Sequence, residues 1–157
     1  MIVEGGDILG RMEKSIEIRV PPEKVWEMLA LDRLLEWVPG YKRDLKSVEY
    51  TSEVRTPEDK LRVGASARGL PKKKGEFNFE ITVSLENQKF AYRLSGTLNV
   101  LVTSILEPVQ QGTKFTYVYD YKMPWGIPGK ILEKLLISEL KKESKSSLEN
   151  LKNILEK

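Results

Sequence analysis

Aromatic residues occupy every second position in one stretch of this sequence: Phe115, Tyr117, Tyr119 and Tyr121. Alternate side chains of an extended strand point to the same face, so the pattern predicts four aromatic rings side by side. Tyrosine joins an apolar ring to a hydroxyl, a combination that can orient the carbonyl or phenol of a bound molecule. The alternative is that these hydroxyls reach backbone or water at the rim of a sheet. Tyr117 fits either interpretation, and for Tyr92 we favour the rim.

Acid-base and nucleophilic chemistry has few candidates, because the chain has no histidine and no cysteine. This composition excludes Ser-His-Asp hydrolases, thiolate nucleophiles, disulfides and nearly all zinc sites, and we expect no metal and no cofactor. The carboxylates of the strand-like stretches are Glu76, Glu80 and Asp120. Each alternates with an aromatic face and is expected to point away from it, and Arg93 is out of phase with Phe90 in the same way. We therefore assign no catalytic residue.

Charge and hydropathy limit the possible partners. The 26 basic and 23 acidic residues are mixed along the chain, so the net charge of +3 is a weak argument for a polyanion, and no nucleic-acid partner is expected. Lysines cluster at residues 72–74 and at Lys141, Lys142 and Lys145, but glutamates separate the second group, so membrane contact is expected to be transient at most. The charged fraction of 31%, rich in Lys and Glu, resembles thermophile usage. No secretory signal or long apolar run occurs, and we expect a soluble cytoplasmic protein whose oligomeric state the sequence leaves open.

The first quarter of the chain predicts a strand followed by two short helices. Apolar and polar residues alternate over residues 12–20. Pro22 then fits the first position of a helix, where its missing N–H would have no partner in any case, and Trp26 lies on the apolar face of that helix. Asp32 is a candidate N-cap for the second helix, which carries Trp37 and ends at a Pro-Gly pair.

Six further strands and one long helix are predicted after these helices. The ranges that alternation and turn residues give for the strands are 45–51, 61–67, 77–85, 90–94, 98–106 and 113–121. The third of them has the clearest pattern, and its apolar face carries Phe77, Phe79, Ile81, Val83 and Leu85. A helix from about residue 128 to the end then carries an apolar stripe that includes Leu132 and Leu136.

These elements predict an α+β fold in a single domain, residues 1–157, with residues 1–10 as a loose lead-in. A curved antiparallel sheet of seven strands with an apolar inner face needs a cover, and the C-terminal helix is the element long enough to lie across it. Trp26 and Trp37 are then expected near the mouth between sheet and helix. Trp125, on a glycine-flanked joint before that helix, fits either an entrance flap or an anchor for the helix.

Four stretches, in this order, resemble the START-like or pollen-allergen-like superfamily, which includes the polyketide cyclase/dehydrase and lipid-transport (SRPBCC) group. They are IEIRVPPEKVWEMLALDRLLEWVPGYK at Ile16–Lys42, RVGA at Arg62–Ala65, GTKFTYVYDYKMP at Gly112–Pro124, and the long final helix. The resemblance covers residues 12–156. It implies a helix-grip fold, in which the sheet wraps around the C-terminal helix and encloses a cavity for apolar ligands.

The function expected from these features is the binding or transport of a hydrophobic small molecule, such as a lipid, isoprenoid, quinone or polycyclic aromatic. One alternative is a polyketide cyclase/dehydratase-like enzyme, and another is a surface interaction module whose core is filled by side chains. An empty cavity of about 300 Å³ would cost on the order of 7 kcal/mol, so an open one is expected to be kept for a ligand. The residues expected to line the cavity or its entrance are Trp26, Trp37, Phe77, Phe79, Tyr92, Phe115, Tyr117, Tyr119, Trp125, Leu132 and Leu136.

Overall fold

Seven antiparallel strands form one curved sheet in the computed structural model, which describes the backbone of residues 9–96, 99–122 and 129–157 and the side chains of residues 10–96, 99–121 and 138–157. The strands are β1 (Leu9–Ile18), β2 (Leu45–Tyr50), β3 (Ser66–Pro71), β4 (Phe77–Leu85), β5 (Lys89–Gly96), β6 (Val100–Val109) and β7 (Gly112–Lys122). Their order in the sheet is β1-β7-β6-β5-β4-β3-β2, and each neighbouring pair is antiparallel. The strands after β2 thus form a meander, and β1 returns to pair with the last strand.

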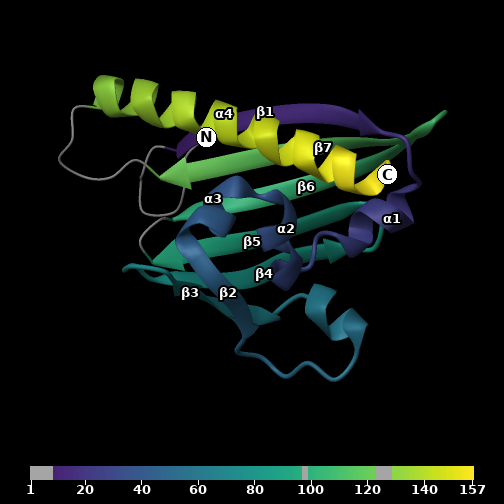
Figure 1. Cartoon of the computed structure of the whole chain (residues 1–157), viewed down its shortest axis with the longest axis horizontal. Helices are drawn as coiled ribbons and strands as arrows, with labels where there is room; N and C mark the ends of the chain where they lie inside the picture. Colours follow the sequence, from purple (N-terminus) through teal and green to yellow (C-terminus); the bar gives the residue numbers. More distant parts are fainter. Residues whose placement is uncertain (1–8, 97–98, 123–128) are drawn as a thin grey trace.

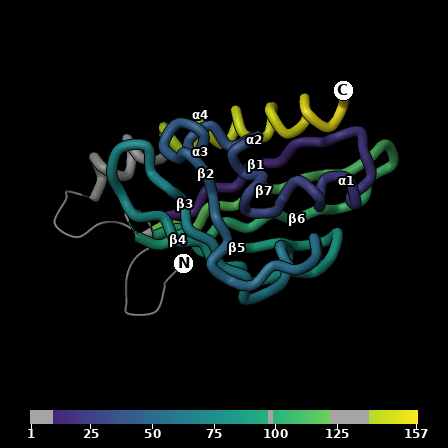
Figure 2. The backbone as a smooth tube through the Cα atoms, turned by 60° about the horizontal axis from the view of Figure 1, so that its bottom comes forward, coloured from purple at the N-terminus to yellow at the C-terminus, as the bar shows by residue number. Residues whose placement is uncertain are grey.

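Helices lie between β1 and β2, between β2 and β3, and after β7. They are α1 (Pro22–Glu27), η1 (Leu31–Arg33), α2 (Leu34–Trp37), α3 (Pro39–Asp44), η2 (Pro57–Leu61) and α4 (Gly129–Leu155). Figure 1 shows α4 running along the sheet above β1 and β7, with α2 and α3 beside it. In Figure 2, turned by 60°, α2, α3 and α4 lie on the same side of the strands. The predicted class is therefore confirmed: an α+β helix-grip fold with short helices after the first strand and a long C-terminal helix across the sheet.

The short helices follow the local chemistry of the chain. Pro22 begins α1, as predicted, and the Pro-Gly pair that was expected only to end a helix begins a third one, α3. Asp32 is not an N-cap, because no side-chain cap is formed at η1 or α2. Its carboxylate instead accepts hydrogen bonds from the Tyr50 hydroxyl (3.3 Å) and the Lys60 ammonium (2.7 Å), so it joins η1 to β2 and η2.

The strand predicted at residues 61–67 is wrong except for its last two residues. Residues 57–61 form η2, and β3 begins at Ser66. Thr56 caps this helix through a capping box with Asp59, whose carboxylate accepts the backbone N–H groups of Arg55 (2.9 Å) and Thr56 (3.1 Å). The Thr-Pro-Glu-Asp sequence, which lies between the strands predicted at 45–51 and 61–67, is therefore a helix start.

The apolar face predicted for β4 holds only over its first half. Phe77, Phe79 and Ile81 are buried, but a β-bulge between Ile81 and Val83 shifts the register. The bulge adds one residue to β4, so the side chains that follow it point to the opposite face from the one that alternation predicts. Leu85 is therefore 53% exposed, while Ser84 pairs with the buried Phe90. A period-two pattern cannot reveal such a bulge, because apolar residues continue across it.

The core lies between the inner face of the sheet and the helices. It is one cluster that includes Phe79, Tyr92, Phe115 and Leu151. On α4, the small residue Ser147 is fully buried in this core. On β1, Gly10 has no side chain, and the Tyr121 ring occupies the space that a Cβ would fill. Among the described helices, none combines the length and the apolar character that a membrane span requires.

Candidate functional site

Four tyrosines from three elements meet between the sheet and the helices. Tyr92 of β5 and Tyr117 and Tyr119 of β7 project from the inner face of the sheet, and Tyr41 of α3 approaches them from above. The Tyr41 and Tyr92 hydroxyls are hydrogen-bonded at 2.9 Å, and the rings of Tyr117 and Tyr119 are 5.0 Å apart between centroids. We call these four residues the tyrosine cluster.

The strand alternation and the position of α3 account for this convergence. Tyr117 and Tyr119 share a face because they are two residues apart on β7, and Tyr119 lies one strand from Tyr92, since both pair with Val102 of β6. Tyr41 lies on the helix that the Pro39-Gly40 pair begins, which was not predicted. The cluster therefore joins strands that are adjacent in the sheet to a helix distant from them in the sequence.

Burial makes the hydroxyls of the cluster persistent neutral donors. Loss of solvent around the Tyr117 hydroxyl raises its pKa to about 12, an effect that the Tyr92 and Tyr119 hydroxyls partly offset. Burial likewise raises the pKa of Tyr41, Tyr92 and Tyr119 well above the ordinary value of 10.0. All four remain phenols, with a proton to donate, throughout the physiological range.

The Tyr117 hydroxyl has spare hydrogen-bonding capacity. It is buried near the Tyr92 and Tyr119 hydroxyls, but it forms no hydrogen bond of ordinary geometry with them or with any other described residue. A buried hydroxyl without a partner costs about 1–3 kcal/mol relative to one that is satisfied. Such a group is a natural contact point for an oxygen or nitrogen of a bound molecule.

Glu143 of α4 adds a carboxylate next to the cluster. Burial raises its pKa above the ordinary value of 4.5, while Arg43 and the Gly40 N–H, which donates to the carboxylate, act in the opposite direction. Its negative charge also contributes to raising the pKa of Tyr41, Tyr117 and Tyr119. A Cβ at Gly40 would lie 1.9 Å from its Oε1, so only glycine leaves room for this approach.

Aromatic rings surround the hydroxyls. Trp37 packs on Phe115 and Tyr117, with centroids 6.1 and 5.4 Å apart, and its indole N–H donates to the Met28 carbonyl at 2.9 Å. Phe79 packs on Tyr41 at 5.5 Å and on Tyr92 at 5.8 Å. These contacts hold the tyrosine rings, so that their hydroxyls keep fixed positions within an apolar wall.

The structure brings together six of the eleven residues predicted from the sequence. They are Trp37, Phe79, Tyr92, Phe115, Tyr117 and Tyr119. Phe77 is buried at the start of β4, beside Leu45 and Gly69. Trp26 packs on Phe90 and lines a separate pocket. Trp125 and the side chains of Leu132 and Leu136 lie outside the described residues.

Sequence reasoning missed Tyr41 and Glu143. Tyr92 was assigned to the rim of the sheet, whereas its side chain is 2% exposed and bonded to Tyr41. Of the strand carboxylates, Glu80 is exposed, and Asp120 is buried beside Arg11 at 3.2 Å, away from the tyrosines. Among the described residues, no group of three or more acidic side chains is arranged to hold a metal ion.

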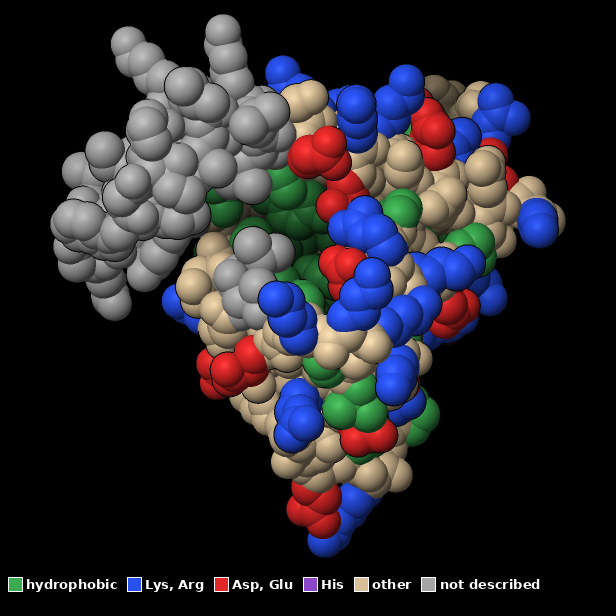
Figure 3. Space-filling view, turned by 60° about the vertical axis from the view of Figure 1, so that its left-hand side comes forward, with side chains coloured by type: hydrophobic (Ala, Val, Ile, Leu, Met, Phe, Trp, Pro, Cys, Tyr) green, Lys and Arg blue, Asp and Glu red, His purple; other side chains and the backbone are tan. Residues whose placement is uncertain are grey.

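A hollow opens on the side of the molecule that lies at the left in Figure 1. Figure 3 shows hydrophobic side chains at its floor and acidic and basic side chains along its margin. An apolar recess with a few polar groups is the usual form of a small-molecule site.

A curved antiparallel sheet that grips a C-terminal helix and carries an aromatic inner face defines the class of helix-grip proteins. The chain belongs to the polyketide cyclase / dehydrase and lipid transport family, whose model matches residues 10–156. The family associates the chain with hydrophobic-ligand binding or with polyketide cyclase-like roles. A comparison with curated protein sequences finds no match.

Solved structures share the fold at low sequence identity. Protein MLL2253 from Mesorhizobium loti is 19% identical with a TM-score of 0.69, over 94% of this chain and 97% of the other. Ara h 8.0201 is 17% identical with a TM-score of 0.67, over 94% and 98%. TTHA0849 from Thermus thermophilus is 22% identical with a TM-score of 0.64, over 93% and 95%. These similarities establish the fold alone.

Proposed function

We propose that this protein binds or transports a hydrophobic small molecule between its sheet and α4, and that an oxygen of the ligand accepts a hydrogen bond from the tyrosine cluster. The observation that carries the proposal is the buried Tyr117 hydroxyl, which has no hydrogen-bond partner of ordinary geometry among the described residues. The family description and the apolar floor of the hollow in Figure 3 support the hydrophobic part of the ligand.

The chemistry of the site favours an oxygen-bearing ring system over a plain hydrocarbon. Neutral tyrosine hydroxyls donate to carbonyl or phenolic oxygens, and the surrounding aromatic rings pack against planar apolar groups. Quinones and oxygenated polycyclic aromatics combine both features. Lipids and isoprenoids with a terminal oxygen satisfy the same donors.

A matched pair of ligands tests the proposal. We expect 2-methyl-1,4-naphthoquinone to bind more tightly than 2-methylnaphthalene, because only the quinone can accept from Tyr117. The preference should be on the order of tenfold, the value of one well-placed hydrogen bond in an apolar site. Both affinities are measured by quenching of tryptophan fluorescence, with displacement by an unlabelled competitor.

Tyr117→Phe is the matched variant, since it removes the hydroxyl and keeps the ring. The quinone preference should disappear in this variant, while affinity for the hydrocarbon stays the same. Tyr50→Phe, outside the cluster, serves as the control and should retain the preference. Equal affinities for both ligands in the unmodified protein would contradict the role of the hydroxyl, and no binding of either would contradict the site itself.

A polyketide cyclase/dehydratase-like activity is the second candidate, and it is favoured by one specific observation. Glu143 of α4, with a raised pKa, lies against Gly40 of α3, next to Tyr41, and its charge acts on the neutral hydroxyls of Tyr41 and Tyr117. Aldol cyclisation needs a base that removes a proton next to a carbonyl, and a hydrogen-bond donor to the oxygen of the carbonyl that is attacked. The Glu143 carboxylate is a group of the first kind, and the tyrosine hydroxyls are groups of the second kind. Cyclisation of a synthetic poly-β-ketone by the protein, lost in Glu143→Gln, would support it; an unchanged rate in that variant would exclude Glu143 as the base.

A further inference from the structure

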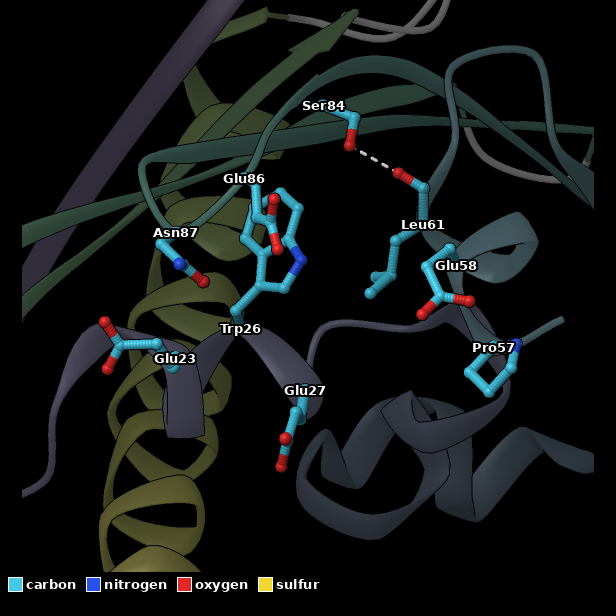
Figure 4. A pocket seen from close by; sticks show the side chains of 9 residues that line it. All are labelled: Glu23, Trp26, Glu27, Pro57, Glu58, Leu61, Ser84, Glu86 and Asn87. Atoms are coloured by element: carbon cyan, nitrogen blue, oxygen red, sulfur yellow. Dashed lines mark hydrogen bonds between the residues drawn. The ribbon is translucent and has the colours of Figure 1, made fainter.

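A second pocket, of about 390 Å³, lies apart from the tyrosine cluster. It is bordered by α1, η2 and the turn between β4 and β5, and none of its lining residues belongs to the cluster. Figure 4 shows Trp26 on one side of it and Leu61 on the other. Ser84, which the β-bulge turns toward this side, donates a hydrogen bond to the Leu61 carbonyl and so fixes η2 against β4.

The charge of this pocket differs from that of the rest of the molecule. Four of its nine lining residues are glutamates, Glu23 and Glu27 of α1, Glu58 of η2 and Glu86 of the turn, and none of the nine is basic. All four are exposed, and none forms an ion pair or a hydrogen bond with a described residue. Because the whole chain carries a net charge of +3, this gathering of acidic groups is not a reflection of overall composition.

Trp26 supplies a second and independent feature. Its side chain is only 7% exposed, and its ring is held edge-to-face against Phe90 at 5.7 Å. The indole N–H has no hydrogen-bond partner among the described residues, and Figure 4 shows the ring nitrogen directed across the pocket toward Leu61 and Glu58. The ring is packed in the core while its N–H faces the pocket, so an acceptor of a molecule bound there can reach this donor.

We propose that this pocket, which we call the acidic pocket, is a docking site for an arginine- or lysine-bearing peptide segment of a protein partner. The partner's cationic side chain lies among the carboxylates, its aliphatic stem packs on Trp26 and Leu61, and a backbone carbonyl next to it accepts from the Trp26 N–H. This inference is independent of the proposed function.

The two features together select a peptide over a free polyamine. Carboxylates alone would attract any organic cation, but a protonated polyamine has no acceptor for the indole N–H. A peptide carries its carbonyl acceptors beside the basic side chain. The carboxylates also come from three separate elements around an open pocket, an arrangement that suits a segment crossing it.

The indole N–H is the probe of choice for a test on the full chain. The protein has three tryptophans, so its ¹H–¹⁵N spectrum contains three indole signals, and Trp26→Phe identifies that of Trp26. Titration with acetyl-Gly-Arg-Gly-amide should shift this signal in a saturable way and leave the Trp37 signal in place. We expect a dissociation constant on the order of 1 mM, typical of a few exposed charge pairs, that rises with added salt.

Matched probes and variants decide the outcome. Acetyl-Gly-citrulline-Gly-amide has the same shape without the charge and should not bind, and spermine should leave the Trp26 indole signal unshifted. The triple variant E23Q/E58Q/E86Q should weaken the arginine peptide roughly tenfold, whereas E49Q/E107Q/E149Q, with the same change of net charge at exposed positions elsewhere, should change it less than about twofold. No saturable shift with the arginine peptide, an equal response to citrulline, a spermine-induced indole shift, or equal losses in the two variants would overturn the proposal.

Discussion

Glu143 shows how a single residue departs from the usual behaviour of its type. Lysines and glutamates on a helix are normally solvated, yet this carboxylate lies half-buried against the Gly40 backbone, next to Tyr41 in the sequence. Partial burial of a carboxylate disfavours its charged form, so the native state holds it at a cost in stability at neutral pH. A residue kept at such a cost is a candidate for function.

Glu143→Gln should therefore be more stable than the unmodified protein near pH 7. The folded-state pKa is raised above 4.5, so the unmodified protein loses stability as the pH rises through that raised pKa, whereas glutamine does not titrate. The two proteins should converge below about pH 4, where the carboxylate is protonated in both the folded and unfolded states. Urea unfolding at several pH values measures the difference, with Glu149→Gln, exposed on the same helix, as control. A difference that did not change with pH would argue against a raised pKa.

The buried tyrosines determine how the stability of the protein changes at high pH. Burial is the main cause of raised pKa values at five tyrosines, Tyr41, Tyr50, Tyr92, Tyr117 and Tyr119. The unfolded chain ionises its tyrosines near pH 10, while folded Tyr117 keeps its proton up to about 12, so stability should fall as the pH rises through this interval. Tyrosinate absorbance should appear together with loss of the near-ultraviolet circular dichroism signal. Gradual ionisation of these five in the intact fold would contradict their burial.

The aromatic residues of β7 could be predicted from the sequence, because alternate side chains of a regular strand point to the same face. It placed Phe115, Tyr117 and Tyr119 on one face correctly, since β7 pairs regularly with both neighbours. Glu143 was missed because charged residues were assigned to solvent. A signal was nevertheless present, since Leu140, Glu143 and Ser147 continue the helical spacing of the buried stripe.

At the level of elements, the contact between α3 and α4 depends on Gly40. The Cβ of an alanine there would meet the end of a flexible side chain, that of Glu143, rather than backbone. Gly40→Ala should consequently lower the free energy of unfolding by less than about 1 kcal/mol, yet displace the carboxylate toward solvent. The pH dependence between pH 4 and pH 7 that Glu143 causes should then weaken, as unfolding of the variant at both pH values would reveal.

Gly112→Ala is the contrasting variant for that prediction. There the new Cβ would lie 2.1 Å from the backbone oxygen of Ile18, which cannot move aside, so we expect a loss above about 2 kcal/mol. If Gly40→Ala were as destabilising as Gly112→Ala, the view that α3 leaves room only for a mobile carboxylate would be wrong.

The elements themselves were predictable where one period dominates. Strands with regular alternation and the long amphipathic helix were placed well, because each pattern has a single structural interpretation. The β-bulge after Ile81 and the η2 helix were missed for different reasons. The bulge leaves no trace in an apolar run, whereas η2 had a capping-box signal at Thr56, in a segment to which no helix was assigned.

On the scale of the whole molecule, the space between the sheet and the helices contains polar groups that are uncommon in a well-packed core. Neutral hydroxyls and a half-buried carboxylate lie where apolar side chains would give greater stability. Only tertiary packing could bring these groups together, since they lie on four different elements, α3, β5, β7 and α4. This is why the cluster as a set was beyond the reach of local sequence patterns.

Ligand binding should therefore stabilise the molecule as a whole. A ligand at about 100 times its dissociation constant adds about 2.7 kcal/mol to the free energy of unfolding, which for a domain of this size raises Tm by about 5–10 °C. We expect 2-methyl-1,4-naphthoquinone to produce this shift in the unmodified protein, measured by circular dichroism. In Tyr117→Phe, removal of an unpaired buried hydroxyl should leave the Tm without ligand equal or higher, and the shift at the same quinone concentration should be smaller. A ligand-free Tm that fell by many degrees in this variant would mean that the Tyr117 hydroxyl serves the core of the fold, and an undiminished shift would mean that the ligand does not reach it.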